Sequence, residues 1–331
     1  MKVLVTGGVG YIGSHTVIEL INSGMEVVII DNLSNSKEEV HEKLEEITNK
    51  KIPFYIGDVC DKDLLRKIFI DEGIDCVIHF AGYKAVGESV MNPLKYYRNN
   101  IDSTLSLLEV MEEFGIYNLV FSSSATVYGK PERLPINEDF PLSTTNPYGT
   151  TKLFIEHILN DMYIANNKWN ITILRYFNPI GASKTGLIGE NPNDIPNNLM
   201  PYIVKVASGE LECLSIFGDD YDTVDGTGVR DYIHVIDLAR GHVLSLNNKE
   251  SGVHVYNLGT GRGTSVLELV KTFEEVNGIK VNYKIAKRRP GDVDECYASI
   301  EKAEKELGFK PIYDIKDMCF DAYNFIKKNT K

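Results

Sequence analysis

The chain has 331 residues, of which 43% are hydrophobic and 25% charged, so it can bury the core of one large domain or two closely joined ones. Its net charge of −12 argues against nucleic acid or an anionic membrane as partner, because the protein as a whole repels phosphate groups. The five scattered cysteines, never in a C-x-x-C pair, favour a reducing compartment, and without a secretory or membrane-spanning segment we expect a cytoplasmic location.

Short apolar runs alternate with longer amphipathic runs in the first half of the chain. Continuous Val/Ile runs separated by helices are typical of a parallel sheet covered on both faces, the doubly wound α/β fold, whose ligands bind at the carboxyl ends of the strands. In chain order we predict a strand at 2–6, a helix at 11–23, strands at 26–30 and 53–56, a helix at 61–71, a strand at 75–80, a helix at 93–114, a strand at 118–122, a helix at 148–166 and a strand at 170–176.

The character of the sequence changes after about Arg175. Residues 178–201 are rich in Asn, Gly and Pro, which is typical of irregular loop, and we place the start of a smaller α/β substrate-binding domain there. Residues 253–257 are strand-like again. We therefore predict a first domain over 1–176 and a second over 177–331, with part of the second, around 229–260, returning to the first.

A glycine-rich loop, GGVGYIG at residues 7–13, joins the first strand to the first helix. Gly7, Gly10 and Gly13 permit a tight turn and close backbone approach, and the following helix N-terminus attracts a pyrophosphate. Asp31 lies eighteen positions past Gly13 at the end of the next strand, where a carboxylate binds an adenosine ribose and repels a 2′-phosphate. The combination predicts a Rossmann-type site for NAD; the alternative is an ordinary glycine turn followed by a surface aspartate.

Tyr148 and Lys152 are four residues apart and project from one face of a predicted helix. A fixed ammonium and a positive nicotinamide ring favour the phenolate; lowering the tyrosine pKa by roughly 3 units requires about 4 kcal/mol. Ser122, Ser123 and Ser124 end another predicted strand, and one of these hydroxyls can relay a proton. Taken singly, the pair and the serines are also common as chance helix and loop residues.

Five longer motifs resemble the extended short-chain dehydrogenase/reductase family and, within it, the UDP-glucose 4-epimerase branch. They are HFAGYKAVGES at 79–89, SSSATVYG at 122–129, RYFNP at 175–179, PNNLMP at 196–201 and GTGVRDYIHV at 226–235. The resemblance covers essentially the whole chain. It implies an isomerase of galactose metabolism that interconverts UDP-galactose and UDP-glucose by C4 epimerisation through a 4-keto intermediate, with tightly bound NAD and no net redox change.

The resemblance also implies roles for individual residues. Tyr148 is similar to the catalytic base, Ser124 to its hydroxyl partner and Lys152 to the residue that orients the nicotinamide ribose. The implied cofactor contacts are Gly7, Gly10, Tyr11, Ile12, Gly13, Asp31, Asn32, Leu33, Ser34, Asn35, Ser36, Asp58, Val59, Phe80, Ala81, Gly82, Lys84, Asn99, Ser122, Tyr148, Lys152 and Phe177. The implied UDP-sugar contacts are Lys84, Ser124, Tyr148, Asn178, Asn198, Leu199, Ser215, Phe217, Arg230, Tyr232, Arg289, Asp292 and Cys296.

Two further expectations come from the same resemblance. The position of Cys296 is occupied by a bulky Tyr in some members of the family, and a small residue leaves room for an N-acetyl group at sugar C2. We therefore expect activity on UDP-N-acetylglucosamine and UDP-N-acetylgalactosamine as well. The family often forms homodimers through the helices predicted at 93–114 and 148–166, which gives the expected assembly.

Two other functions remain as alternatives, a nucleotide-sugar 4,6-dehydratase and a non-catalytic NAD-binding scaffold. A dehydratase needs an acid and a base over C5 and C6, but Ser124 is followed by Ala125 and Thr126, with no carboxylate. A scaffold can dispense with Tyr148 and Lys152, and both are present. The aspartates before Gly226 lack calcium-loop spacing and the histidines form no metal-spaced cluster, so we predict no metal.

Overall fold

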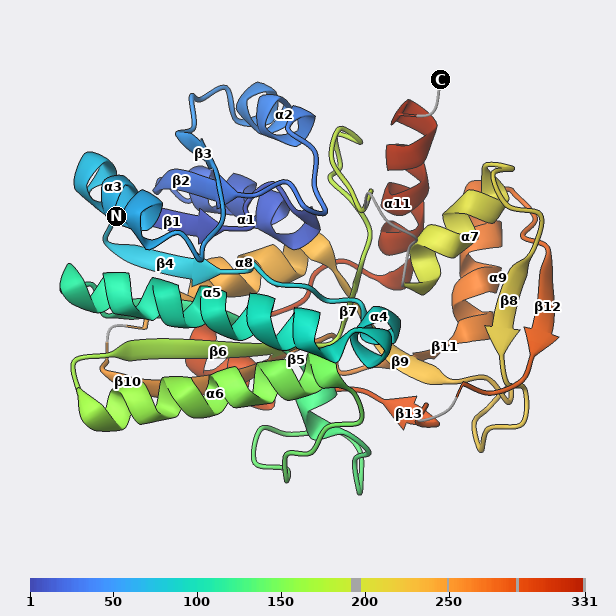
Figure 1. Cartoon of the computed structure of the whole chain (residues 1–331). Helices are drawn as coiled ribbons and strands as arrows, with labels where there is room; N and C mark the ends of the chain where they lie inside the picture. The colour runs from blue at the N-terminus through green and yellow to red at the C-terminus, as the bar shows by residue number, and fades with distance from the viewer. Residues whose placement is uncertain (192–197, 249, 290–291, 330–331) are drawn as a thin grey trace. The chain divides into compact units, whose positions relative to one another are not determined.

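The computed structural model describes residues 1–191, 198–248, 250–289 and 292–329 (Figure 1). The chain divides into two compact units. The first contains residues 1–129, 141–175 and 239–256, and the second contains residues 130–140, 176–238 and 257–331. None of the described helices is both long enough and apolar enough to cross a membrane.

A seven-stranded sheet with the order β10-β6-β5-β4-β1-β2-β3 forms the centre of the first unit. The pairs β5–β4, β4–β1, β1–β2 and β2–β3 are parallel, and Thr6 lies beside both Ile30 and His79 at the carboxyl edge. This arrangement confirms the predicted doubly wound fold. The strands are β1 (Lys2–Thr6), β2 (Glu26–Asp31), β3 (Phe54–Ile56), β4 (Cys76–His79), β5 (Asn118–Ser124), β6 (Asn170–Tyr176) and β10 (Gly252–Leu258).

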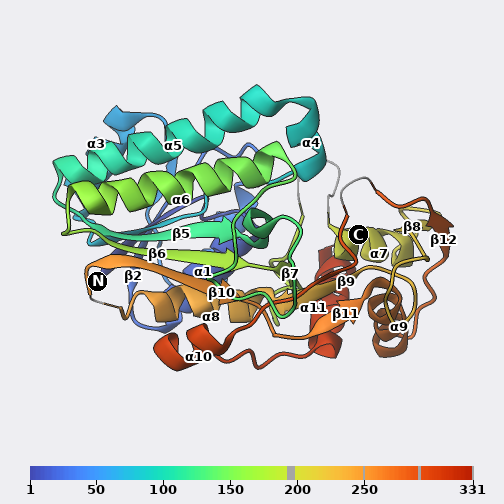
Figure 2. The same ribbon diagram turned by 90° about the horizontal axis from the view of Figure 1, so that it is seen from below.

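Helices cover both faces of this sheet. Figure 2 shows α3, α5 and α6 on one face and α1 and α8 on the other. Their apolar sides bury a continuous core that includes Leu4, Val77, Phe121 and Trp169. The helices are α1 (Tyr11–Asn22), α2 (Glu39–Thr48), α3 (Lys62–Glu72), α4 (Val86–Met91), α5 (Pro93–Glu113), α6 (Pro147–Ala165) and α8 (Val235–Ser245), with a short 3₁₀ helix η1 (Ala125–Tyr128).

The second unit contains two smaller sheets and a separate core. In one sheet β9 pairs with β7, β11 and β13, and in the other β12 pairs with β8. The core includes Ile203, Ile216, Leu269 and Phe273. Its elements are β7 (Asn178–Ile180), α7 (Leu199–Ala207), β8 (Leu214–Phe217), β9 (Val229–His234), β11 (Gly263–Ser265), α9 (Val266–Asn277), β12 (Tyr283–Ala286), β13 (Glu295–Cys296), α10 (Glu301–Leu307) and α11 (Ile315–Asn329).

The prediction of irregular loop over residues 178–201 is partly wrong. Residues Asn178–Ile180 form β7 because they pair with Tyr232–His234 of β9, a partner far away in the sequence. α7 begins at Leu199, within the motif at 196–201. The motif residues Pro196 and Asn197 lie outside the described residues.

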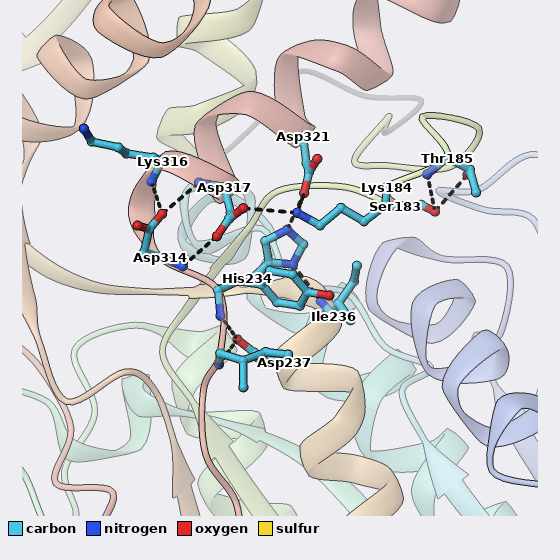
Figure 3. A network of polar contacts seen from close by, with 12 residues as sticks. Ser183, Lys184, Thr185, His234, Ile236, Asp237, Asp314, Lys316, Asp317 and Asp321 are labelled. Atoms are coloured by element: carbon cyan, nitrogen blue, oxygen red, sulfur yellow. Dashed lines mark hydrogen bonds and ion pairs between the residues drawn. The ribbon is translucent and has the colours of Figure 1, made fainter.

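A buried polar cluster fastens α11 within the second unit (Figure 3). Nδ1 of His234 accepts from the Ile236 N–H at 3.1 Å, so Nε2 carries the proton and donates to Asp321 Oδ2, also at 3.1 Å. Lys184 Nζ lies 2.8 Å from the same carboxylate oxygen and 3.2 Å from Asp317 Oδ1. The buried Asp321 carboxylate is thus paired, and the cluster has a structural role in joining α11 to β9 and to the turn after β7.

Candidate active site

The glycine loop makes a tight turn between β1 and α1. Gly7 has a φ of +71°, and its N–H donates to the Ile30 carbonyl at 2.8 Å. A Cβ on Gly13 would lie 2.2 Å from the Gly7 carbonyl oxygen, so a side chain cannot fit there without backbone movement. Among the described residues, no side chain caps the N-terminus of α1, which follows Gly10. The loop therefore presents a helix N-terminus to an anion, and this fits the pyrophosphate of a dinucleotide.

Asp31 ends β2 beside this loop and is 8% exposed. Its Oδ1 accepts from the Leu33 N–H and the Ser36 hydroxyl, both at 2.9 Å, and its Oδ2 accepts from the Val9 N–H at 3.3 Å. Burial raises the pKa of Asp31, and these three hydrogen bonds oppose the rise. The carboxylate therefore joins the glycine loop to the segment 32–36, and its remaining acceptor capacity suits an adenosine ribose.

The segment after β2 also contacts Asp58. Asp58 Oδ2 accepts from the Asn32 side chain at 3.0 Å, and Oδ1 accepts from the Cys60 N–H at 2.8 Å. Burial alone would raise the pKa of Asp58, but these hydrogen bonds outweigh it and the pKa is lowered. Leu33 has a φ of +58°, a costly conformation for a non-glycine residue. Several of the expected cofactor contacts are thus held in one constrained loop, and Val59, which follows Asp58, is buried.

The loop after β4 holds another group of the expected cofactor contacts. Lys84 Nζ lies 5.8 Å from the centre of the Tyr11 ring, which brings the two expected contacts together. Gly82 has a φ of +152°, and a Cβ there would meet Asn100 Oδ1 at 3.1 Å. Asn99, an expected cofactor contact, donates to Asn100 at 3.0 Å, and no sequence pattern points to Asn100 itself. Asn100 bonds both backbone groups of Tyr83 and the hydroxyl of Thr151 on α6, so it sets the course of this loop.

Tyr148 and Ser124 meet at the carboxyl edge of the sheet. β5 extends to Ser124, two residues beyond its predicted end, and the Ser124 side chain hydrogen-bonds to Tyr148 and accepts from the Thr126 hydroxyl at 3.0 Å. Pro147 is the first residue of α6, one residue before the predicted start, and Asn146 caps the helix by accepting from the Gly149 N–H at 2.9 Å. Because α6 begins here, the Tyr148 phenol reaches the serine cluster.

Burial controls the charge of both members of the Tyr–Lys pair. It raises the pKa of Tyr148 to about 12, against a lowering contribution from Ser124, so in the protein alone the phenol is protonated at neutral pH. It lowers the pKa of Lys152 to about 8, and nearby Glu156 opposes that change. Lys152 Nζ donates to the Ser122 carbonyl at 2.7 Å and lies 4.8 Å from the centre of the Phe121 ring. Ionising Tyr148 therefore requires further positive charge, such as a nicotinamide ring.

His79 has a structural environment. Its Nε2 lies 3.1 Å from the Thr104 hydroxyl, which itself donates to the Asn100 carbonyl, so Nε2 carries the proton and donates. Its Nδ1 lies 2.8 Å from the Thr6 hydroxyl and accepts from it. Burial lowers the pKa of His79 to about 3, with the charge of Lys152 acting in the same direction. His79 is thus a neutral core residue with both nitrogens bonded.

The second unit gathers several of the expected UDP-sugar contacts on paired strands. In the β9–β13 pair Cys296 lies beside Arg230, and Arg230 Nη2 is 3.6 Å from Asp292 Oδ1. In the β7–β9 pair Asn178 lies beside Tyr232. Burial raises the pKa of the Cys296 thiol to about 11, so this side chain is small and neutral at physiological pH. The residues Pro290 and Gly291 of the same segment lie outside the described residues.

Other expected contacts of the second unit lie near β8 and α7. The Arg289 guanidinium stacks 3.9 Å from the centre of the Phe217 ring, and Ser215 lies on the same strand as Phe217. Asn198 precedes Leu199 at the start of α7, and its Nδ2 donates to Glu190 Oε1 at 2.8 Å. The remaining expected cofactor contact of this unit, Phe177, is buried, and its N–H donates to the Leu258 carbonyl at 3.1 Å.

Sequence reasoning missed a buried ion pair one turn beyond Lys152. Glu156 Oε2 accepts from Arg175 Nη2 at 2.6 Å, and both side chains are 5% exposed. Ser123 donates to Glu156 Oε1 at 2.5 Å, and Arg175 Nη1 donates to the Tyr128 hydroxyl at 3.0 Å. The available signal was an ionisable residue on the buried side of a helix and another inside an apolar strand, since such charges need partners.

Three comparisons identify similar proteins. The family model for GDP-mannose 4,6 dehydratase matches residues 4–322. The UDP-glucose 4-epimerase of Bacillus subtilis is 56% identical over 331 residues, 99% of this chain and 98% of its own. The crystal structure of UDP-glucose 4-epimerase from Bifidobacterium longum with NAD+ and UDP has a TM-score of 0.97 at 54% identity, covering 99% of both chains. The UDP-Glc/GlcNAc 4-epimerase of Campylobacter jejuni has a TM-score of 0.86 at 36% identity, again over 99% of both chains.

Proposed function

Because the chain belongs to the UDP-glucose 4-epimerase family, within the NAD-dependent epimerases and dehydratases, we propose that it interconverts UDP-glucose and UDP-galactose with tightly bound NAD. The observation that best supports this chemistry is the contact between Tyr148 and Ser124 at the carboxyl edge of a doubly wound sheet. Lys152 lies one turn after Tyr148 on α6. In our proposal the first unit supplies the dinucleotide site and the acid–base groups, and the second supplies the nucleotide-sugar contacts.

The chain's own residues move the proton. Tyr148, as the phenolate, accepts the proton of the sugar 4-hydroxyl, with the Ser124 hydroxyl as hydrogen-bond partner and relay. NAD, when bound, supplies the hydride acceptor and donor at C4. Once the 4-keto sugar has turned over, Tyr148 returns the proton to the oxygen, which now lies on the opposite side of the ring. No net oxidation or reduction results.

The proposed substrate contacts place most of the binding energy on UDP and little on the hexose. Arg230 and Arg289 carry planar guanidinium groups, which suit the oxygens of a diphosphate, and Phe217 offers an aromatic face to the base. Firm binding of UDP with few contacts to the hexose lets the sugar turn over without leaving. Binding energy remote from the reacting carbon then serves the reaction at C4.

The turn that follows Ser124 supports epimerisation over dehydration. A 4,6-dehydratase needs carboxyl groups to remove and add protons at C5 and C6. Here the turn is Ala125–Tyr128, and its Thr126 hydroxyl donates to Ser124. This turn contains no carboxyl group for elimination, which supports the epimerase over the dehydratase.

The function can be tested without added cofactor. We expect the purified protein to convert UDP-galactose to UDP-glucose when no NAD is supplied, because the dinucleotide stays bound throughout the cycle. The products are identified by chromatography, and NAD released on denaturation is measured in the same sample. Turnover that depends strictly on added NAD would contradict retained cofactor, and formation of a 6-deoxy-4-keto sugar would identify a dehydratase.

Cys296 underlies a prediction on substrate breadth. The small thiol lies beside Arg230 in the β9–β13 pair, so we propose that it leaves room for an N-acetyl group at C2 and that the protein also epimerises UDP-N-acetylglucosamine. Replacing Cys296 with Tyr is expected to lower turnover of the acetylated sugar by about tenfold or more and to leave UDP-galactose turnover within a few-fold. Cys296→Ala, which stays small, is the control. A wild-type protein without measurable activity on the acetylated sugar would refute this proposal.

We also propose a homodimer that forms through α5 and α6. These neighbouring helices expose large apolar side chains, including Leu94, Phe154 and Ile164, and such exposure is typical of an interface. Light scattering that gives the mass of a single chain at micromolar concentration would contradict it.

The proposed cytoplasmic location is supported by the five cysteines, all of which are free thiols in the structure.

A further inference from the structure

Four elements that shape the Tyr148 site are joined by the Glu156–Arg175 ion pair. Glu156 lies on α6, Arg175 on β6, Ser123 on β5 and Tyr128 on η1. Arg175 donates to Glu156 through Nη2 at 2.6 Å and through Nε at 3.1 and 3.2 Å, and Ser123 donates to Glu156 from the strand. The carboxylate is thus fully bonded in the interior.

The partner of Glu156 on β5, Ser123, lies between two residues that contact the proposed catalytic groups. Ser123 stands between Ser122, whose carbonyl accepts from Lys152, and Ser124, which contacts Tyr148. Glu156 follows Lys152 by four residues, so both side chains project from the same face of α6. A bond from Ser123 to Glu156 therefore fixes the end of β5 against the helix that carries the Tyr–Lys pair.

The charges around Lys152 can be followed element by element. On α6 it has Tyr148 before it and Glu156 after it, and on β5 the uncharged Ser122 carbonyl and Phe121 ring. From β4 it faces His79, which is neutral because burial lowers its pKa to about 3. From β6 the Arg175 guanidinium is directed to Glu156 and to Tyr128. Among the described residues, Glu156 is thus the negative charge that acts on the buried ammonium.

We propose that Glu156 is a positioning residue for the reaction, whose carboxylate, held by Arg175 and Ser123, keeps Lys152 an ammonium ion and holds the end of β5 against α6. This inference rests on the proposed function, because it assigns Glu156 a role only if Tyr148 and Lys152 do the acid–base work. Its alternative is a purely structural ion pair, which would stabilise the fold without affecting the ionisation of Lys152.

The sign of the pH effect follows from burial. Lys152 titrates with a pKa lowered to about 8, so its ammonium is present below that pH and is lost as the pH rises through it. Removing the negative charge of Glu156 leaves Arg175 uncompensated and lowers the Lys152 pKa further. The alkaline limb of the kcat profile must then move to lower pH, while KM for UDP-galactose stays near its original value.

The test compares three variants of the NAD-containing enzyme. Glu156→Gln is expected to move the alkaline limb of kcat down by roughly one pH unit. Tyr128→Phe is the matched control: it removes a hydroxyl from the same network without altering a charge near Lys152, and its limb should not move. Glu156→Gln with Arg175→Met removes both charges, and its limb should fall between those of Glu156→Gln and the wild type.

A direct titration of Lys152 tests the inference without measuring turnover. The Lys152 side-chain resonance is followed by NMR in protein made with isotope-labelled lysine, assigned by its absence from Lys152→Met. Its midpoint should fall in Glu156→Gln and stay in Tyr128→Phe. The inference is overturned if Lys152 titrates in folded Glu156→Gln with the same midpoint as in the wild type. If Glu156→Gln does not fold, the same outcome in the double variant overturns it. Such a result leaves the proposed function intact, because the proposed function is tested separately by the activity of Tyr148→Phe.

Discussion

Tyr148→Phe is expected to lower kcat on UDP-galactose by about 10³-fold or more and to leave NAD bound. Phenylalanine keeps the ring in its buried position at the start of α6 and removes only the hydroxyl that contacts Ser124. Ser124 cannot replace the lost base, because a serine hydroxyl does not ionise near neutral pH. Turnover is measured by product chromatography, and bound NAD by its release on denaturation.

Tyr55→Phe is the matched control for this variant. Tyr55 lies in the same unit, and its hydroxyl donates to Glu72 at 2.9 Å, in a contact unrelated to the serine cluster. Its turnover and NAD content should equal those of the wild type. Undiminished turnover in Tyr148→Phe would exclude Tyr148 as the base, and loss of bound NAD together with turnover would point to a structural role for the phenol.

The parts of the site that the sequence predicts are those whose function depends on local geometry. A tight turn and a free helix end require glycines at fixed spacing, so the loop at 7–13 can be predicted from the sequence alone. Two side chains four residues apart share a helical face, so the pairing of Tyr148 with Lys152 can be predicted in the same way. For both, the structure adds the surroundings: the carbonyl of Ser122 under the ammonium, and burial that leaves Tyr148 protonated until more positive charge arrives.

The parts that the sequence does not reveal depend on partners distant along the chain. Glu156 and Arg175 are 19 positions apart and meet only because α6 packs on the sheet. β7 is three residues long and exists through its pairing with β9, so the composition of residues 178–201 gave no sign of it. Asp31 shows a subtler limit: its position predicted a ribose contact, but three hydrogen bonds from its own chain show that it also organises the loop.

Gly13→Ala is expected to abolish stable NAD retention and to lower the melting temperature. The new Cβ would lie 2.2 Å from the Gly7 carbonyl oxygen and 3.0 Å from the Gly8 Cα, and both neighbours are backbone atoms that cannot rotate away. The turn must therefore open. Forcing extra carbon into a packed site costs about 1–3 kcal/mol, and every 1.4 kcal/mol lost from dinucleotide binding is about tenfold in affinity.

Gly87→Ala is the control for that variant, because a Cβ at Gly87 in α4 meets no atom within 4 Å among the described residues. Alanine there should leave NAD content unchanged and stability equal or slightly higher, since alanine favours a helix over glycine. NAD content and melting temperature are measured on both variants, with and without excess NAD. With excess NAD present, the melting temperature of Gly13→Ala should still lie below that of Gly87→Ala, because ligand stabilisation grows with affinity for the folded state. If Gly13→Ala kept its NAD through purification, the glycine loop would not be the pyrophosphate site, and the assignment of the acid–base groups beside a bound nicotinamide would lose its anchor.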